Sequence, residues 1–153
     1  MTEVAREVWF FNDTEALNNR YRSDLKKLFR KHGYRVSSVG LFAPLWAAPL
    51  RLIGLALRPS RPAVSSNLRT NLAVLSAVWL HGLIILNGLG RHRQSRVLRT
   101  FLIMILRVSK NKAVAVQSYA DFRYFRRFAR MENRLAWVPG SGGTVKAVGN
   151  GNG

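Results

Sequence analysis

The chain has 153 residues, of which 48% are hydrophobic, and it contains no cysteine. This length suits one domain with its own core, and the lack of cysteine excludes disulfides and thiolate metal sites. The formal net charge of +18 points to a polyanionic partner or an anionic membrane surface. No acidic residue stands between Asp24 and Asp121, whereas sixteen Lys or Arg residues fall there.

The N-terminal part predicts a strand, a helix and a second strand. Val8–Phe11 is a short aromatic and β-branched run, typical of a buried strand. Turn and capping residues follow at 12–14, and we expect a helix from there to about Lys31. Its apolar face is formed by Leu17, Tyr21, Leu25 and Leu28. Gly33 ends the helix, and Tyr34–Leu41 is the second strand candidate, so we expect parallel pairing.

Residues 42–57 form an apolar segment interrupted by two prolines, Gly54 and Arg51. Two interpretations fit this pattern. The segment can lie on a membrane, with Trp46 and the arginines at headgroup level. Alternatively, it is an ordinary Pro-broken helix that covers the sheet.

The next part predicts a strand at Pro62–Ser66, then a helix, then a strand at Leu83–Leu86. The helix face is formed by Leu68, Leu72, Leu75 and Trp79, and Gly82 ends the helix. A transmembrane helix is the alternative, because Thr70–Gly90 lacks Lys, Arg, Asp and Glu for 21 residues, enough to cross a bilayer of ~30 Å. Polar residues within the stretch favour the shorter elements.

The last part predicts two helices and two strands. The helix at Ser95–Lys112 carries a narrow basic stripe on an otherwise apolar body that we expect to be buried. The stripe is either a solvated edge or a binding face. Ala113–Gln117 is a strand, the capping-box spacing from Ser118 starts another helix, and Ala136–Val138 is the last strand.

Together these elements predict an α/β fold with a single Rossmann-like, open and mainly parallel sheet that has helices on both faces. The domain covers residues 1–142, and residues 143–153 form a Gly- and Asn-rich tail that we expect to be disordered. In such sheets ligands gather at the carboxyl ends of the strands. Amide side chains and glycines follow several of these ends, an arrangement that suits a sugar and equally suits turn formation.

Several classes of site are excluded. The chain has no P-loop, no GxGxxG between a first strand and helix, and no GxSxG elbow. Its three histidines lack metal-ligand spacing, and no two carboxylates are placed to work together. Asp13 and Asp121 each follow a strand and can either act in a site or cap a helix. The sequence alone contains no complete active site.

Three stretches together resemble the N-terminal domain of family 4 glycosyltransferases, which have the GT-B fold. They are "HGLIILNGLGRHR" (81–93), "AVAVQSYADFRYF" (113–125) and "WVPGSGG" (137–143). The stretch "VSSNLRTNLAVL" (64–75) is similar to the preceding strand and helix of the family. The resemblance covers roughly residues 7–143, and the order and spacing of the motifs make it more specific than any one of them.

The resemblance implies the acceptor-binding half of a retaining enzyme that acts on a polyprenyl-linked or other membrane-surface saccharide in polysaccharide biosynthesis. The nucleotide-sugar donor and its acidic pair belong to a C-terminal domain that is absent here, so we expect no cofactor on this chain and no transfer without a donor-binding chain. The chain departs from the family where the usual Val-Asp or Val-Asn after GSG is Gly143-Thr144, and where the first strand–helix turn lacks a glycine. The acceptor-binding candidates are Asn12, Asp13, Asn67, Asn87, Gly88, Gly90, Arg91, Arg93, Gln117 and Asp121, with Arg93 expected near a carrier phosphate. The interdomain turn is Pro139, Gly140, Ser141 and Gly142.

The sequence leaves other functions open. We expect a cytoplasmic protein, peripheral on the inner face of the cell membrane, because the N-terminus does not resemble a secretory signal and anionic lipid attracts Lys and Arg. A nonenzymatic membrane-surface protein is the first alternative. A nucleic-acid binder is the second and less favoured one, in which the run "FRYFRRFARM" (122–131) stacks bases and pairs phosphates.

Overall fold

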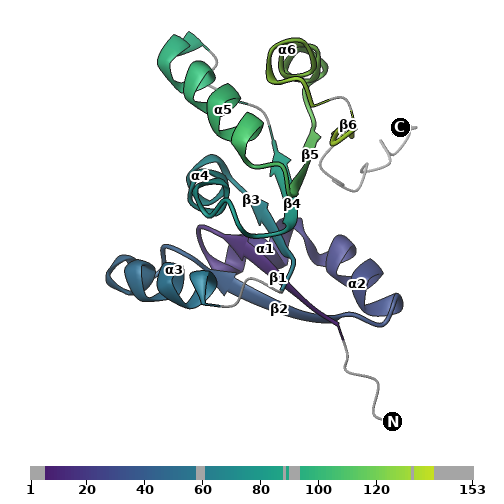
Figure 1. Ribbon diagram of the computed structural model, residues 1–153. Coiled ribbons are helices and arrows are strands. Elements are labelled where there is room, and N and C mark those ends of the chain that lie inside the picture. The colour runs from purple at the N-terminus through teal and green to yellow at the C-terminus, as the bar shows by residue number, and fades with distance from the viewer. Residues whose placement is uncertain (1–5, 58–60, 88, 90–93, 132, 140–153) are drawn as a thin grey trace, which may run out of the picture.

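The computed structural model describes residues 6–57, 61–87, 89, 94–131 and 133–139. It contains one open sheet of six parallel strands in the order β2-β1-β3-β4-β5-β6, as Figure 1 shows. The strands are β1 (Glu7–Asn12), β2 (Arg35–Gly40), β3 (Ala63–Ser66), β4 (Gly82–Leu86), β5 (Lys112–Val116) and β6 (Leu135–Trp137). The predicted Rossmann-like α/β architecture is therefore confirmed.

Helices cover both faces of the sheet (Figure 1). They are α1 (Glu15–Tyr21), α2 (Ser23–Lys31), α3 (Ala48–Ala56) after a short 3-10 turn at Leu45–Ala47, α4 (Leu68–Ser76), α5 (Arg96–Val108) and α6 (Tyr119–Ala129). The larger core lies between one face and α3 to α6, with Leu55, Leu75, Leu102 and Phe125 among its buried residues. A smaller core lies on the other face, where side chains of α2 pack on β1 and β3.

The first predicted helix is two helices in the structure, and the predicted apolar face is confirmed at Leu25, which packs on the smaller core, but was wrong at Leu28. The chain breaks at Arg22, which ends α1 and precedes α2. Leu28 is half exposed, whereas a polar stripe is buried instead, formed by Asn18, Arg22 and Lys26. Asn18 explains part of this, because its Nδ2 donates to the carbonyl of Phe10 in β1 over 2.8 Å. The Asn18 amide thus has a backbone partner on the neighbouring strand, as a buried polar group requires.

The described part of residues 70–90 does not form a transmembrane helix. It comprises the end of α4, a loop and β4, so the transmembrane alternative was wrong there, and the predicted helix ends before Trp79. None of the described helices combines the length and the apolar character that a bilayer crossing requires. β4 also lies close to β3, since a Cβ built on Gly82 would lie 2.1 Å from the carbonyl oxygen of Ala63.

At the edge of the sheet where the strands begin, basic side chains donate hydrogen bonds to backbone carbonyl groups. Lys112 is 1% exposed, and its Nζ donates over 2.8 Å to the carbonyl of Ala77, just after α4. Arg134 donates to the carbonyls of Ser109 and Lys112 over 2.7 and 3.1 Å. The last carbonyls of a helix lack partners within the helix, so these cations stabilise the ends of α4 and α5. Burial lowers the pKa of Lys112 from 10.5 to about 8.

Candidate functional site

The strand order places a switch point between β1 and β3. From β1 the chain moves to β2 on one side, and from β2 it returns across β1 to β3 and continues to β6 on the other side. The connections therefore diverge at the carboxyl ends of β1 and β3, the usual position of a ligand crevice in such sheets. Asn12 ends β1, and Asn67 directly follows β3.

Asn12 and Asn67 are in direct contact at this point. The Nδ2 of Asn67 donates to the Oδ1 of Asn12 over 2.5 Å, and the same oxygen accepts the backbone N–H of Asp13 over 2.8 Å. Asn67 has a φ of 72°, which costs a residue other than glycine of the order of 1–3 kcal/mol. Strained backbone of this kind is concentrated at functional sites, so the conformation of Asn67 marks this edge as a candidate site.

Asp13 links the first loop to α4. Its Oδ1 accepts the hydroxyl of Thr70 over 2.6 Å. The N-cap of α1 is Thr14, whose Oγ1 accepts the N–H of Leu17 over 3.3 Å. Helix capping, the alternative role for Asp13, was therefore wrong, because the side chain that caps is one residue further along. The carboxylate instead adds negative charge beside the Asn12–Asn67 pair.

Arg22 connects the remaining strand ends and was missed by the sequence analysis. Its guanidinium donates from Nε to the hydroxyl of Ser66 over 2.8 Å and from Nη2 to the Oδ1 of Asn87 over 2.7 Å. The side chain is 6% exposed, and burial lowers the pKa of the guanidinium, which nevertheless stays protonated in proteins. The site therefore contains a fixed positive charge at the ends of β3 and β4. The signal that could have found it is the polar i, i+4 spacing of Asn18, Arg22 and Lys26.

The candidates after β5 lie further along the same edge. Gln117 follows β5, and its backbone N–H donates to the carbonyl of Leu86 in β4 over 3.1 Å. Asp121 is buried in the first turn of α6, where Ser118 caps the helix by accepting the N–H of Asp121 over 3.4 Å. The predicted capping position is confirmed. The structure brings Asn12 and Asn67 into direct contact, and Arg22 joins Asn87 to Ser66, the residue before Asn67. Gln117 and Asp121 stand two strands away from β3.

The remaining candidates fall outside the described residues. They are Gly88, Gly90, Arg91, Arg93, Gly140, Ser141 and Gly142. Of the proposed interdomain turn only Pro139 is described, and it is exposed two residues after the end of β6. Over the described ranges, no group of three or more His, Asp or Glu side chains could hold a metal ion.

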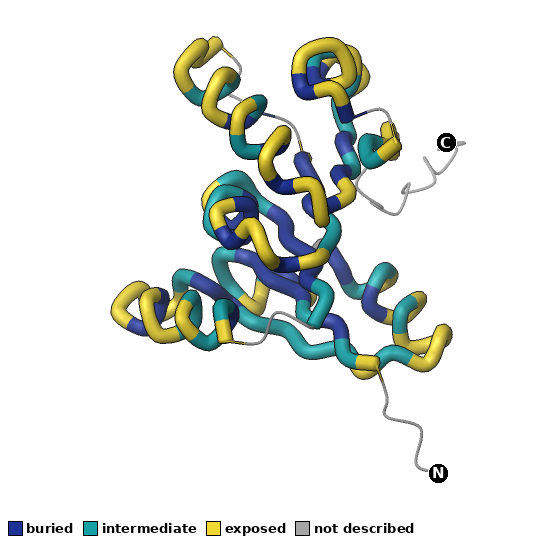
Figure 2. The backbone as a smooth tube through the Cα atoms, viewed as in Figure 1, coloured by how far each residue is buried: buried dark blue, intermediate teal, exposed yellow. Residues whose placement is uncertain are grey.

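Two helices on the larger-core face also carry exposed apolar residues. Figure 2 shows the exposed segments of α3 and α5 in yellow. On the 3-10 turn and α3 these are Leu45, Trp46, Leu50, Ile53 and Leu57, each 56–76% exposed. On α5 they are Val97, Phe101, Met104 and Val108, each 46–82% exposed. The expectation that the body of α5 is buried was therefore wrong for this stripe. Residues 42–57 do include a helix that covers the sheet, but its outer side is apolar.

No protein-family model, no curated protein and no solved structure significantly matches this chain.

Proposed function

We propose that this chain is the acceptor-binding half of a retaining, family 4 glycosyltransferase of the GT-B type that acts at a membrane surface. The observation that carries the proposal is the contact between Asn12 and Asn67 at the switch point of the sheet, beside which Arg22 joins Ser66 to Asn87 after β4. The three asparagines were selected from the sequence as strand ends similar to those of the family. Amide groups can donate to and accept from sugar hydroxyls, and Arg22 adds a positive charge for a carrier phosphate.

The charge and the exposed apolar helix support a membrane-bound acceptor. α3 and the turn before it expose Trp46, Leu50 and Leu57 in a chain of net charge +18. Apolar side chains beside cations are the usual composition of segments that lie in a bilayer interface. We therefore propose that the chain is peripheral on the inner face of the cell membrane and that it receives a polyprenyl-phosphate-linked saccharide there.

The nucleotide sugar, in this proposal, is held by a second Rossmann-like domain. A GT-B enzyme binds donor and acceptor on opposite sides of a cleft, so the residues described here contact only the acceptor. Transfer then requires a donor-binding domain in addition to the residues described here, which by themselves are expected to bind acceptor without turnover.

The acceptor proposal is tested by calorimetric titration with a short-chain polyprenyl-diphosphate-linked hexose. Asn87→Ala should weaken binding by roughly tenfold, since one hydrogen bond near a charged group contributes about 1.5 kcal/mol or more. Asn111→Ala is the matched control, because Asn111 is an exposed amide at the opposite end of the strands, and it should bind normally. Absence of binding by the unaltered chain, or equal losses in both variants, would overturn the proposal.

The membrane proposal is tested separately by sedimentation with vesicles containing anionic lipid. The double variant Trp46→Ser/Leu50→Ser should lose most of its vesicle binding. Leu28→Ser is the control, because Leu28 is half exposed on α2, which covers the other face. Strong vesicle binding combined with no titration by the saccharide favours the nonenzymatic membrane-surface protein instead.

A further inference from the structure

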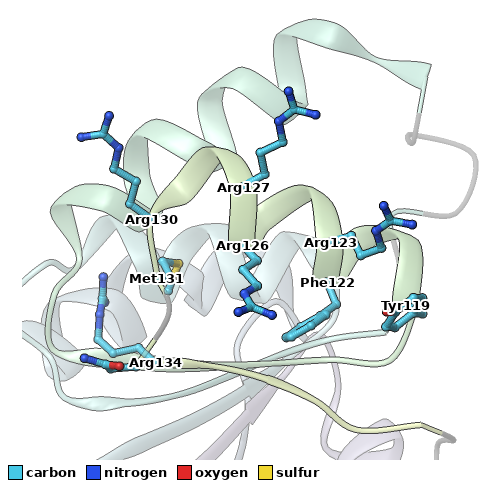
Figure 3. A pocket seen from close by; sticks show the side chains of 9 residues that line it. Tyr119, Phe122, Arg123, Arg126, Arg127, Arg130, Met131 and Arg134 are labelled. Carbon is cyan, nitrogen blue, oxygen red and sulfur yellow. The ribbon is translucent and has the colours of Figure 1, made fainter.

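A further recess lies away from the switch point, along α6. It is an open groove of about 1020 Å³ between α6 and the loop that leads to β6. We call it the arginine groove, and its lining residues are Tyr119, Phe122, Arg123, Arg126, Arg127, Arg130, Met131, Asn133 and Arg134. Figure 3 shows Arg126 and Phe122 extending from α6 on the side of Arg134, with Arg123 beside Tyr119.

The groove has a single sign of charge. Five of its nine lining residues are arginines, and none of the nine is acidic. Arg123, Arg126 and Arg130 are all exposed. Arg123 and Arg126 lie about one helical turn apart on α6, ~5.4 Å along the axis, and Arg130 directly follows the helix. A row of cations at this spacing suits a linear polyanion rather than a single anion.

The charged path continues beyond the groove. A second recess of about 350 Å³ shares Arg130 and Arg134 with the first and adds Arg107 and Lys110 from the end of α5. Arg107 and Arg134 donate to backbone carbonyls, so they are fixed in place, while their charge still faces the recess. The two recesses together extend the positive surface around the C-terminal end of α6.

Aromatic rings stand at the other end of the groove. Tyr119 is 54% exposed, and its ring stacks on Phe122 at 6.2 Å with an interplanar angle of 24°. Trp137 of β6 is also half exposed and meets Tyr119 edge-on at 5.0 Å. Of the run at 122–131, by contrast, Phe125 is fully buried in the core. The rings that line the groove itself are those of Tyr119 and Phe122.

We propose that the arginine groove binds single-stranded nucleic acid. Cationic grooves that follow the phosphate backbone, combined with aromatic rings on which bases stack, are the general features of such binding. An anionic membrane is less suited to this recess, because most of the exposed large apolar side chains of the described residues lie elsewhere, on the 3-10 turn, α3 and α5. An acidic polypeptide would match the charge but would make no use of the stacked rings. The proposal is independent of the glycosyltransferase proposal, since it rests on α6 and not on the strand ends.

Fluorescence anisotropy with a labelled oligouridine of about 20 nucleotides tests it, at a series of salt concentrations. The triple variant Arg123→Gln/Arg126→Gln/Arg130→Gln should weaken binding at least tenfold at about 0.1 M salt. The magnitude of its logarithmic salt slope should fall by about 2, since each phosphate contact to a single strand contributes roughly 0.7. Tyr119→Ala should weaken binding about five- to tenfold with the salt slope unchanged, and Tyr119→Phe should restore it.

The control variant removes three positive charges from a different part of the surface. Lys27→Gln/Arg30→Gln/Lys31→Gln lowers the net charge by the same amount on α2, where all three side chains are exposed. This variant should keep the affinity and the salt slope. Equal losses in the two triple variants would show attraction by net charge alone and would overturn the proposal. The proposal also fails if polyglutamate of equal charge displaces the oligouridine as well as unlabelled oligouridine does, or if anionic vesicles bind in its place through the groove arginines.

Discussion

Asn67 donates a 2.5 Å hydrogen bond to Asn12 from a backbone conformation that few residues other than glycine adopt, with φ at 72°. The bond joins the carboxyl ends of β1 and β3, the two strands on either side of the switch point. The amide therefore compensates part of the backbone strain by fixing the loop after β3 against β1. The contribution of the side-chain hydrogen bond and the cost of the backbone conformation at position 67 can therefore be separated by mutation.

Asn67→Ala should lower the free energy of unfolding by about 1–3 kcal/mol, because it removes the bond and keeps the strained backbone. Asn67→Gly removes the same bond but adopts positive φ freely, so it should be less destabilising than Asn67→Ala. Urea denaturation of the two variants and the unaltered chain measures the difference. If glycine costs as much as alanine, the backbone at position 67 is not strained.

Arg22→Lys should destabilise the fold although it keeps the charge. The guanidinium reaches both Ser66 and Asn87, 44 and 65 residues away in the sequence, and an ammonium group lacks the planar fork that makes both bonds. Loss of a buried bond of this kind costs about 1–3 kcal/mol. Arg30→Lys on the exposed side of α2 should cost almost nothing. Thermal or urea denaturation compares them, and equal stability of the two variants would show that the bridge does not contribute.

Lys112 should make the stability depend on pH in the alkaline range. Its pKa is lowered by burial to about 8 from 10.5, so between these values the unfolded chain binds more protons than the folded chain. The free energy of unfolding due to this residue should therefore rise from pH 8 to pH 10.5 and be level below pH 8. Lys112→Met should remove this rise, whereas Lys27→Met, at an exposed lysine, should retain it. The measurement is a series of urea denaturations across this range, and an identical slope in both variants would contradict the burial effect.

Two glycine-to-alanine substitutions should change the stability of the fold in opposite directions. A Cβ at position 82 would lie 2.1 Å from the carbonyl oxygen of Ala63, which is strand backbone and cannot move aside cheaply, whereas a Cβ on Gly54 meets nothing within 4 Å. Gly82→Ala should therefore destabilise by about 3 kcal/mol or more. Gly54 lies inside α3, where alanine is the better helix former by about 1 kcal/mol, so Gly54→Ala should raise the melting temperature. A tolerated Gly82→Ala would mean that β3 and β4 can separate locally.

The order of the strands and helices could be predicted because buried parallel strands are short apolar runs with turn residues at their ends. The strand from Ala113 to Gln117, for example, is shifted by one residue to Lys112–Val116. Asn12, Asn67 and Asn87 could be selected for the same reason, since each stands where a strand ends. The strand ends thus carried most of the site information in the sequence.

The partners of these residues could not be predicted. Arg22 meets Asn87 across 65 residues of sequence, and periodicity within a helix contains nothing about such distant contacts. The break between α1 and α2 was missed for a similar reason, because burial of Asn18 depends on a carbonyl of β1. Local patterns favoured Leu28 for the buried face, whereas tertiary hydrogen bonds place Asn18 and Arg22 in the interior.

The basic side chains bound to carbonyls at the amino-terminal edge of the sheet imply that salt weakens some charged interactions of this molecule more than others. Lys112 and Arg134 hold backbone oxygens within the fold, where mobile ions screen charges much less than at the surface. The exposed arginines of α6 lie at the surface, where salt does screen their charges. Washing with concentrated salt should therefore dissociate polyanions bound at the surface. The hydrogen bonds at the ends of α4 and α5 should persist, so the protein can be separated from bound polyanions while it stays folded.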